Sequence, residues 1–207
     1  MHANRLDAPF QRTLLAAGAF FDFAASWLDR AEADELERAL ENELTWEQRE
    51  IELFGKRILQ PRLIAWAGTL PYRYSGQTLE PRPFTPALSG LFALMRERAG
   101  LEFDHALVNR YRDGTHSMGF HADAEPELGQ NPVVASLSLG APRRFVIVHK
   151  RDRSDRHEIE LVHGSLLVMG GTMQHHYRHG LPRTRRLVTQ RINVTFRSLL
   201  RAPDAAP

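Results

Sequence analysis

The spacing of hydrophobic positions divides the chain into a helical part and a part made of short alternating segments. From about Phe23 to Leu44, apolar residues recur at helical spacing on an acidic background, which predicts a first helix. A second helix is predicted from about Pro86 to Ala99. Thr85 can cap its start, Pro86 suits its first turn and Gly100 ends it. We expect each helix to bury one apolar stripe.

From His105 onward the pattern changes to short segments of the kind found in strands, separated by turn signals such as Asp113-Gly114 and Gly170-Gly171. About eight such segments at this spacing indicate a jelly roll or barrel. We therefore predict an α+β protein that is mainly β. The segments are Ala106 to Arg112, Met118 to His121, Val133 to Leu139, Arg144 to His149, His157 to Val162, Ser165 to Met169, Gln174 to Tyr177, and Leu187 to Phe196.

The remaining stretches set the expected domain limits. Residues 1–22 are expected to be irregular, residues 23–200 to form a single domain, and residues 201–207 to be a frayed tail. Residues 51–84 show no clear period and predict short strands and long loops. We see no internal repeat and no second domain.

Composition limits the class of protein. The 207 residues, 43% of them hydrophobic, suffice for one sizeable core. Without cysteine, any metal site must use nitrogen and oxygen ligands. Apolar runs such as Leu14 to Phe21 are too short and interrupted to span a membrane, and the N-terminus lacks the features of a secretory signal. We expect a cytoplasmic monomer with no membrane partner.

Charge is unevenly distributed although the formal net charge is only +2. Residues 29–52 contain ten acidic residues against three arginines, whereas residues 143–201 contain thirteen lysines and arginines against four acidic residues. Charge runs usually mark a solvated surface. The asymmetry nevertheless suits a protein whose C-terminal half faces a polyanion.

The sequence His121-Ala122-Asp123 lies at the end of a predicted strand and offers two metal ligands. Residues two apart on an extended chain share a face, so both side chains can reach one metal. An isolated His-x-Asp pair is more often found as two surface residues on a loop. The pair therefore needs a third ligand from another strand to be informative.

Three histidines near Gly180 are candidates for that third ligand. On an extended segment His175 and His179 share one face, together with Tyr177, while His176 points away. Next to Gly180 the chain can turn tightly around a metal, so we favour His179, with His175 as the alternative. Two imidazoles and one carboxylate match the ligands of non-haem iron oxygenases, which keep open positions for oxygen and a co-substrate.

The last predicted strand carries polar residues on one face and apolar residues on the other. Arg191, Asn193, Thr195 and Arg197 alternate with an apolar set, Ile192, Val194 and Phe196. Arginines inside a barrel require an anion, and a guanidinium fork matches a carboxylate. The alternative places the arginines on a solvent-exposed face and packs the apolar face on a helix. The pattern alone does not decide between the two. Asn109 and Tyr111 form a second polar pair at the same spacing.

These motifs together resemble the AlkB family of Fe(II)- and 2-oxoglutarate-dependent dioxygenases, over about Phe54 to Leu199 and most closely its DNA-repair branch. The motifs are Asn109-Arg110-Tyr111 with Asp113-Gly114, His121-Ala122-Asp123, Ala135-Ser136-Leu137-Ser138-Leu139-Gly140, His163-Gly164-Ser165-Leu166-Leu167, His179-Gly180 and Arg191 to Arg197. The resemblance implies a double-stranded β-helix core with the N-terminal helices packed on one sheet. It implies iron binding by His121, Asp123 and His179. It implies 2-oxoglutarate binding by Asn109, Tyr111, Arg191, Asn193, Thr195 and Arg197.

The resemblance also implies substrate contacts. Phe54-Gly55-Lys56 resembles a wedge that probes the base stack, and Tyr72-Arg73-Tyr74-Ser75-Gly76 resembles a lid that holds a flipped base. An apolar side chain can fill the gap left by an extruded base, and an aromatic ring can stack on that base. Ordinary core packing is the alternative for Phe54 and for the two tyrosines.

The expected activity follows from the resemblance. Oxygen and 2-oxoglutarate would be converted to succinate and carbon dioxide while an N-alkyl group on a base of 1-methyladenine or 3-methylcytosine type is hydroxylated and lost as an aldehyde. Alkylated DNA is the expected partner, with RNA, a protein side chain or a small molecule as the alternative substrate. A homologue that binds nucleic acid without catalysis is a further alternative. The sequence departs from the DNA-repair branch at Ala124, where an acidic residue is usual, and Glu125 follows.

Overall fold

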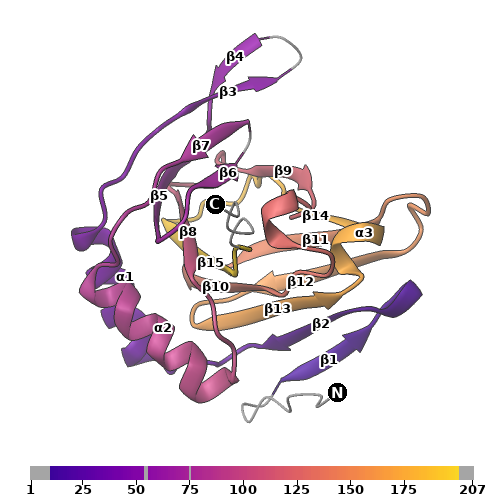
Figure 1. The fold of residues 1–207 in the computed structure, drawn as a ribbon, viewed down its shortest axis with the longest axis horizontal. Coiled ribbons are helices and arrows are strands. Elements are labelled where there is room, and N and C mark those ends of the chain that lie inside the picture. The colour runs from indigo at the N-terminus through magenta and orange to yellow at the C-terminus, as the bar shows by residue number, and fades with distance from the viewer. Residues whose placement is uncertain (1–9, 54–55, 75, 201–207) are drawn as a thin grey trace, which may run out of the picture.

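Two antiparallel sheets face each other in the computed structural model, which describes residues 10–53, 56–74 and 76–200 (Figure 1). The larger, seven-stranded sheet has the order β1 (Gln11–Leu14), β2 (Ala19–Ala24), β13 (Ser165–Gly171), β10 (Val134–Gly140), β15 (Arg191–Arg197), β8 (His105–Tyr111) and β5 (Leu63–Gly68). The four-stranded sheet has the order β12 (Arg156–Leu161), β11 (Arg143–His149), β14 (Tyr177–Leu181) and β9 (Met118–His121). The expected jelly-roll core is confirmed.

Two hairpins lie outside these two sheets, and the first of them projects at the top of Figure 1. They are β3 (Glu50–Leu53) with β4 (Lys56–Leu59), and β6 (Tyr72–Tyr74) with β7 (Gln77–Leu79). The short helices are η1 (Ala16–Gly18), η2 (Pro126–Leu128) and α3 (Met173–His176). No helix in the described ranges is long and apolar enough to cross a membrane.

The two long helices, α1 (Arg30–Glu43) and α2 (Pro86–Ala99), pack together on the outer face of the larger sheet (Figure 1). Asp29 starts α1 with a capping box, in which its side chain accepts from the Glu32 backbone and the Glu32 side chain accepts from the Asp29 backbone. Thr85 caps α2 as predicted, and Gly100 ends it in the left-handed conformation with φ 62°.

The alternation along β15 places its two kinds of side chain in different environments. Ile192, Val194 and Phe196 are buried in the core beneath the helices, with Leu40 of α1 and Leu88 of α2. Because side chains alternate across a strand, Arg191, Asn193, Thr195 and Arg197 point between the sheets. All four are buried. The question left open by the pattern is therefore decided in favour of inward-facing arginines.

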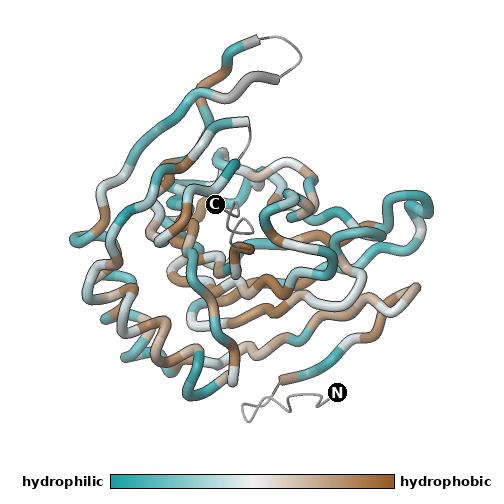
Figure 2. Tube along the Cα trace, viewed as in Figure 1, coloured by the Kyte–Doolittle hydropathy of each residue, from teal (hydrophilic) through white to brown (hydrophobic). Residues whose placement is uncertain are grey.

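A second apolar cluster fills the space between the sheets. Val134, Leu167 and Met169 of the larger sheet pack there against Phe145 and Ile147 of the smaller one. Figure 2 shows the central strands as largely hydrophobic and the loop between β11 and β12, at the right, as hydrophilic. The apolar layer supports the polar pocket described below.

Three local predictions are wrong. Residues 1–22 were expected to be irregular, but residues 11–14 and 19–24 form β1 and β2, because β2 pairs with β13 and β1 pairs with β2 at the edge of the larger sheet. The first helix accordingly begins at Arg30, and Phe23 belongs to β2. Gln174 to Tyr177 is mostly the helical turn α3, in which the backbone N–H groups of His175 and His176 donate to the Thr172 carbonyl.

Candidate metal centre and anion pocket

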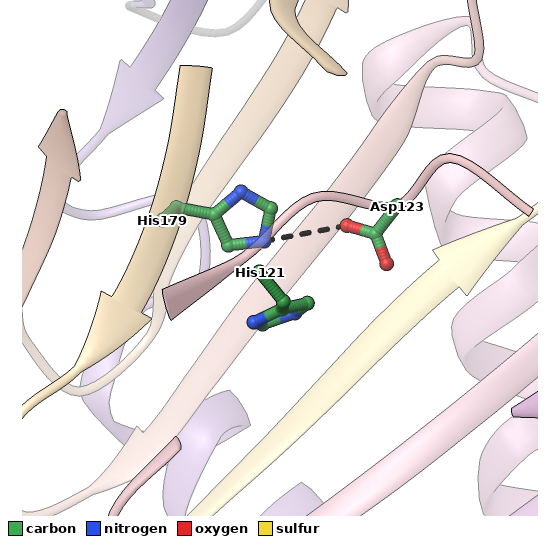
Figure 3. Close-up of side chains that lie close together, drawn as sticks. All are labelled: His121, Asp123 and His179. Carbon is green, nitrogen blue, oxygen red and sulfur yellow. Dashed lines mark ion pairs between the residues drawn. The ribbon is translucent and has the colours of Figure 1, made fainter. Parts of the chain in front are cut away.

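His121, Asp123 and His179 converge at one end of the four-stranded sheet (Figure 3). His121 ends β9 and lies directly opposite His179 on β14, and Asp123 follows two residues after β9. One potential ligand atom from each residue lies within 4.8 Å of the others. The expected convergence is confirmed, and within the described residues this is the only such group found.

Neighbouring groups orient each of the three side chains. Nδ1 of His121 donates to the Gly119 carbonyl at 2.9 Å, which leaves Nε2 free to act as a ligand. The Asp123 backbone N–H donates to the side chain of Gln174 at 2.9 Å. The His179 ring stacks on Phe145 with the ring centroids 5.4 Å apart.

Gly180 lets the two ligand strands approach closely. A Cβ atom at this position would lie 3.1 Å from the Met118 carbonyl oxygen on β9. The glycine next to His179 is therefore explained by packing between β14 and β9, rather than by the tight turn expected from the sequence.

The electrostatics of the group suit a divalent cation. Burial alone would raise the pKa of Asp123, but the Arg197 guanidinium and the nearby imidazoles hold this pKa well below its usual range. Burial and the neighbouring His179 lower the pKa of His121 to about 4. Nδ1 of buried His179 has no hydrogen-bond partner in the described part of the chain. An ionised carboxylate with neutral imidazoles is the state that binds metal, so these residues fit Fe(II).

A polar pocket lies between the sheets beside this group. Most of its polar wall comes from β8 and β15, whose residues Asn109 and Asn193 pair directly across the two strands. The pocket is lined by Leu107, Asn109, Tyr111, Met118, His121, Asp123, Ser136, Phe145, Met169, His179, Leu181, Arg191, Asn193, Thr195 and Arg197. The six residues expected to bind 2-oxoglutarate all lie in this lining.

Arg191 provides the positive charge at one end of the pocket. It is 2% exposed, and its Nη2 donates to the Ser138 hydroxyl at 2.9 Å. Its Nε has no hydrogen-bond partner among the described residues. Burial lowers the pKa of Arg191 to about 10. A buried guanidinium that lacks a carboxylate partner fits a bound carboxylate anion such as that of 2-oxoglutarate.

Arg197 lies at the metal end of the pocket. Its Nε donates to Oδ1 of Asp123 at 3.1 Å, and its Nη2 donates to the same oxygen. Nη1 of this buried arginine has no hydrogen-bond partner within the described ranges. Arg197 can thus hold the Asp123 carboxylate and still offer one donor to a ligand.

Asn193 and Thr195 form hydrogen bonds with each other, and Asn193 also donates to β10. The Asn193 amide donates to the Ser136 hydroxyl at 2.8 Å and to the Leu137 carbonyl at 2.9 Å. The Thr195 hydroxyl donates to the Asn193 side-chain oxygen at 3.2 Å. These bonds fix the floor of the pocket.

The expected substrate residues are less closely grouped. Tyr72 and Tyr74 are buried on β6, and Arg73 between them is exposed. The Tyr72 ring lies 5.5 Å from the Arg197 guanidinium, which connects the β6–β7 hairpin to the metal end of the pocket. Lys56 is the first residue of β4. Phe54, Gly55 and Ser75 lie outside the described residues.

Several residues with structural roles at the site were missed by the sequence reasoning. Gln174 orients the backbone of Asp123, and Ser138 orients Arg191. Arg62 contacts Asn109 from outside the pocket lining. No spacing rule singles out these three residues, because each contacts a residue that is far away in the sequence. His175, the alternative ligand, is exposed on α3 and contacts the Gln130 carbonyl instead.

A jelly roll that carries a His-Asp-His group beside an arginine-lined pocket defines the architecture of an iron-dependent oxygenase. Residues 21–197 match the family described as the 2OG-Fe(II) oxygenase superfamily. The chain therefore belongs to this superfamily, and within it to the AlkB family, and is an Fe(II)- and 2-oxoglutarate-dependent dioxygenase.

Two groups of relatives support the assignment to the AlkB family. The chain is 38% identical to DNA oxidative demethylase ALKBH2 of Mus musculus, over 94% of this chain and 86% of that protein. It is 38% identical to alpha-ketoglutarate-dependent dioxygenase alkB homolog 3 of Homo sapiens, over 87% of this chain but only 66% of that protein. The solved structure of OsALKBH1 aligns with a TM-score of 0.60 at 18% identity, covering 92% of this chain and all of that one. This structural likeness supports the fold.

Proposed function

We propose that the protein removes alkyl groups oxidatively from N-alkylated bases of the 1-methyladenine and 3-methylcytosine type in DNA. The observation that carries this proposal is the intact His-Asp-His group beside an arginine pocket, in a chain 38% identical to a DNA oxidative demethylase. Loss of the alkyl group as an aldehyde restores the original base.

In this proposal His121, Asp123 and His179 would hold Fe(II), and Arg191 and Arg197 would anchor 2-oxoglutarate. When bound, the metal with oxygen and 2-oxoglutarate supplies the oxidant for the alkyl group. Arg197 keeps Asp123 ionised and oriented. Asn109, Tyr111, Asn193 and Thr195 complete the polar wall of the pocket.

The β6–β7 hairpin would hold the extruded base. The Arg197 guanidinium lies over the Tyr72 ring at 5.5 Å, and the His105 ring meets it at 4.9 Å. Glu125 is partly buried, and its Oε2 has no hydrogen-bond partner in the described part of the chain. A carboxylate here can accept from the exocyclic amino group that 1-methyladenine and 3-methylcytosine share. Phe54-Gly55-Lys56, Arg73 and Ser75 remain proposed contacts with the surrounding strand.

The segment after β14 would contact the phosphate backbone. Arg183, Arg185 and Arg186 are exposed there, and two of them line a cleft shared with Arg144. Exposed guanidinium groups bind phosphates and make affinity depend on salt. Both DNA and RNA carry this backbone, so the basic segment supports a nucleic-acid substrate without selecting between them.

A panel of oligonucleotides tests the proposal. DNA and RNA strands of matched sequence, each with one 1-methyladenine, 3-methylcytosine or unmodified base, are incubated with Fe(II) and 2-oxoglutarate, and repair is read by mass spectrometry. We expect repair of the methylated DNA strands. Faster repair of RNA would assign the same chemistry to an RNA substrate, and repair of neither strand would overturn the proposed substrate class.

The Asp123→Ala variant is the matched control for chemistry. We expect its circular dichroism spectrum to match that of the wild type while repair is abolished. Repair by Asp123→Ala with added Fe(II) would refute the ligand assignment.

A further inference from the structure

Arg62 connects the anion pocket to the β6–β7 hairpin. It directly precedes β5 and is 4% exposed. Its Nε donates to Oδ1 of Asn109 at 2.7 Å, and its Nη2 donates to the Tyr74 hydroxyl at 2.8 Å. Among the side chains that the structure describes, no carboxylate forms an ion pair with Arg62. A buried arginine bonded to two neutral groups needs a functional explanation, since burying an unpaired charge is costly.

The bond to Asn109 determines which end of that amide faces the pocket. Because Oδ1 accepts from Arg62, the amide nitrogen of Asn109 is the end available to the pocket. An N–H donor is what a carboxylate ligand requires. If the Arg62 side chain were apolar, nothing in this contact would prevent the amide from turning its oxygen towards the anion.

The bond to Tyr74 fixes the hairpin to the same guanidinium. Tyr74 is 5% exposed and pairs with Gln77 across the hairpin. Its hydroxyl also lies 3.9 Å from the sulfur of Met118, which lines the pocket. Arg62 therefore anchors β6 to the wall of the pocket rather than to a surface loop.

Positive charge concentrates around this contact. Burial raises the pKa of Tyr111, and the guanidinium charges of Arg62, Arg191 and Arg143 lower it. The hydrogen-bond acceptors of Arg143 are three backbone carbonyls, those of Asp113, His116 and Pro182. Arg191 lines the pocket, and Arg62 and Arg143 lie outside its lining but close enough that their charges also favour an anion there.

We propose that Arg62 is a positioning residue that couples binding of 2-oxoglutarate to the placement of the β6–β7 hairpin. The inference rests on the proposed assignment of Asn109 to the 2-oxoglutarate pocket. When the anion binds, Asn109 and Arg62 are held together, and Tyr74 is held with them. The β6–β7 hairpin, which receives the base, is then more firmly held in enzyme that already contains the co-substrate.

Hydrogen exchange and calorimetry test the coupling without nucleic acid. The protein is loaded with Mn(II) in place of iron, 2-oxoglutarate is added, and exchange is followed at the amides of residues 72–74 and 77–79. In the wild type we expect 2-oxoglutarate to slow exchange there by about tenfold. In Arg62→Met we expect binding of 2-oxoglutarate to weaken about tenfold, the size of one charge-assisted hydrogen bond. At saturating 2-oxoglutarate its hairpin should gain no protection.

Three further variants separate positioning from general damage. Tyr74→Phe removes only one contact, so affinity for 2-oxoglutarate should stay within about twofold of wild type while the protection is lost. Arg62→Lys keeps the charge but not the two-armed geometry and should recover part of the affinity. Arg96→Met removes an exposed arginine on α2 and should change neither measurement.

Wild-type affinity for 2-oxoglutarate in Arg62→Met, or full protection of the hairpin in Tyr74→Phe, would overturn the coupling. If Arg62→Met fails to fold, the protection measured in Tyr74→Phe decides the question. Failure of the protein to repair any alkylated oligonucleotide would contradict the proposed function but leave this test intact, because no nucleic acid is used.

Discussion

Arg197 approaches Asp123 from the side opposite to His179. Two nitrogens of Arg197 donate to Oδ1, while Oδ2 lies 3.3 Å from Nε2 of His179. One carboxylate oxygen is thus held by a guanidinium and the other faces the imidazole. The arginine that the sequence assigned to 2-oxoglutarate also controls the ionisation and orientation of the candidate metal ligand.

This relationship predicts that Arg197 contributes to metal affinity. Replacing Arg197 with Met removes the two guanidinium donors to Asp123 and raises the pKa of that carboxyl. We expect Mn(II) affinity, measured by calorimetry, to fall by about 10- to 100-fold, the usual effect of losing a group that orients a ligand. Breaking a buried pair also costs about 3–5 kcal/mol of stability. Arg197→Met that folds and binds Mn(II) like wild type would contradict the role.

Arg191 should control affinity for 2-oxoglutarate rather than for metal. In Arg191→Met we expect KM for 2-oxoglutarate to rise at least about 100-fold, because a buried charge-assisted pair is removed. Mn(II) binding should be unchanged. The KM of Arg191→Lys should lie between those of the wild type and Arg191→Met, since lysine retains the charge but lacks the two-armed guanidinium. An unchanged KM in the Met variant would place the co-substrate carboxylate elsewhere.

His105 should make the protein less stable in mild acid. It is 1% exposed, and burial followed by the Arg197 charge lowers its pKa to about 3 from an ordinary value of 6.5. Between these values the unfolded chain binds a proton that the folded one does not. The contribution of neutral His105 to the free energy of unfolding is therefore fully present above pH 6.5 and is lost as the pH falls towards 3.

The size of this effect can be measured by urea unfolding. One pKa unit corresponds to about 1.4 kcal/mol, so the contribution lost between pH 7 and pH 5 is about 2 kcal/mol. His105→Phe keeps an aromatic ring against Tyr72 and should remove this part of the pH dependence. An identical pH profile in wild type and variant would show that His105 titrates normally in the folded state.

Glu125 should affect the handling of the base and leave 2-oxoglutarate binding unaffected. Position 124, where the DNA-repair branch usually has an acidic residue, is an exposed alanine here. The acidic group beside Tyr72 belongs to the next residue, Glu125. In Glu125→Gln we expect kcat/KM for methylated oligonucleotides to fall about tenfold, with KM for 2-oxoglutarate unchanged, since one hydrogen bond to the exocyclic amine is weakened. Equal losses on both substrates would indicate a general disturbance of the site.

The parts of the fold that the sequence predicts best are those with strong local signals. Pro86 to Ala99 combines a capping threonine, an early proline and a terminal glycine, and the structure reproduces it to the residue. Residues 11–24 were missed because β2 becomes a strand through pairing with β13, far away in the sequence. The segment around His175 was misassigned because a four-residue helical turn is too short to show a period.

The site shows the same division. His121 and Asp123 are close in sequence, and the motif places His179 by resemblance, so their convergence could be predicted. The sequence did not predict whether the arginines of β15 face inwards, because the apolar face of that strand could pack either on a helix or inside the barrel. The structure decides this through the helices, which cover Ile192 and its apolar neighbours. Contacts such as that of Arg62 with Asn109 depend on pairing across strands and leave no local pattern.

The stoichiometry of the reaction provides the sharpest test of oxidative demethylation by this protein. Succinate and released formaldehyde are quantified in one reaction that contains the protein, Fe(II), 2-oxoglutarate and a DNA oligonucleotide with a single 1-methyladenine. We expect nearly equal amounts of the two products, matching the amount of restored adenine, and neither product above background with Asp123→Ala. Succinate formed without restored adenine, or no succinate at all, would contradict oxidative demethylation of this base.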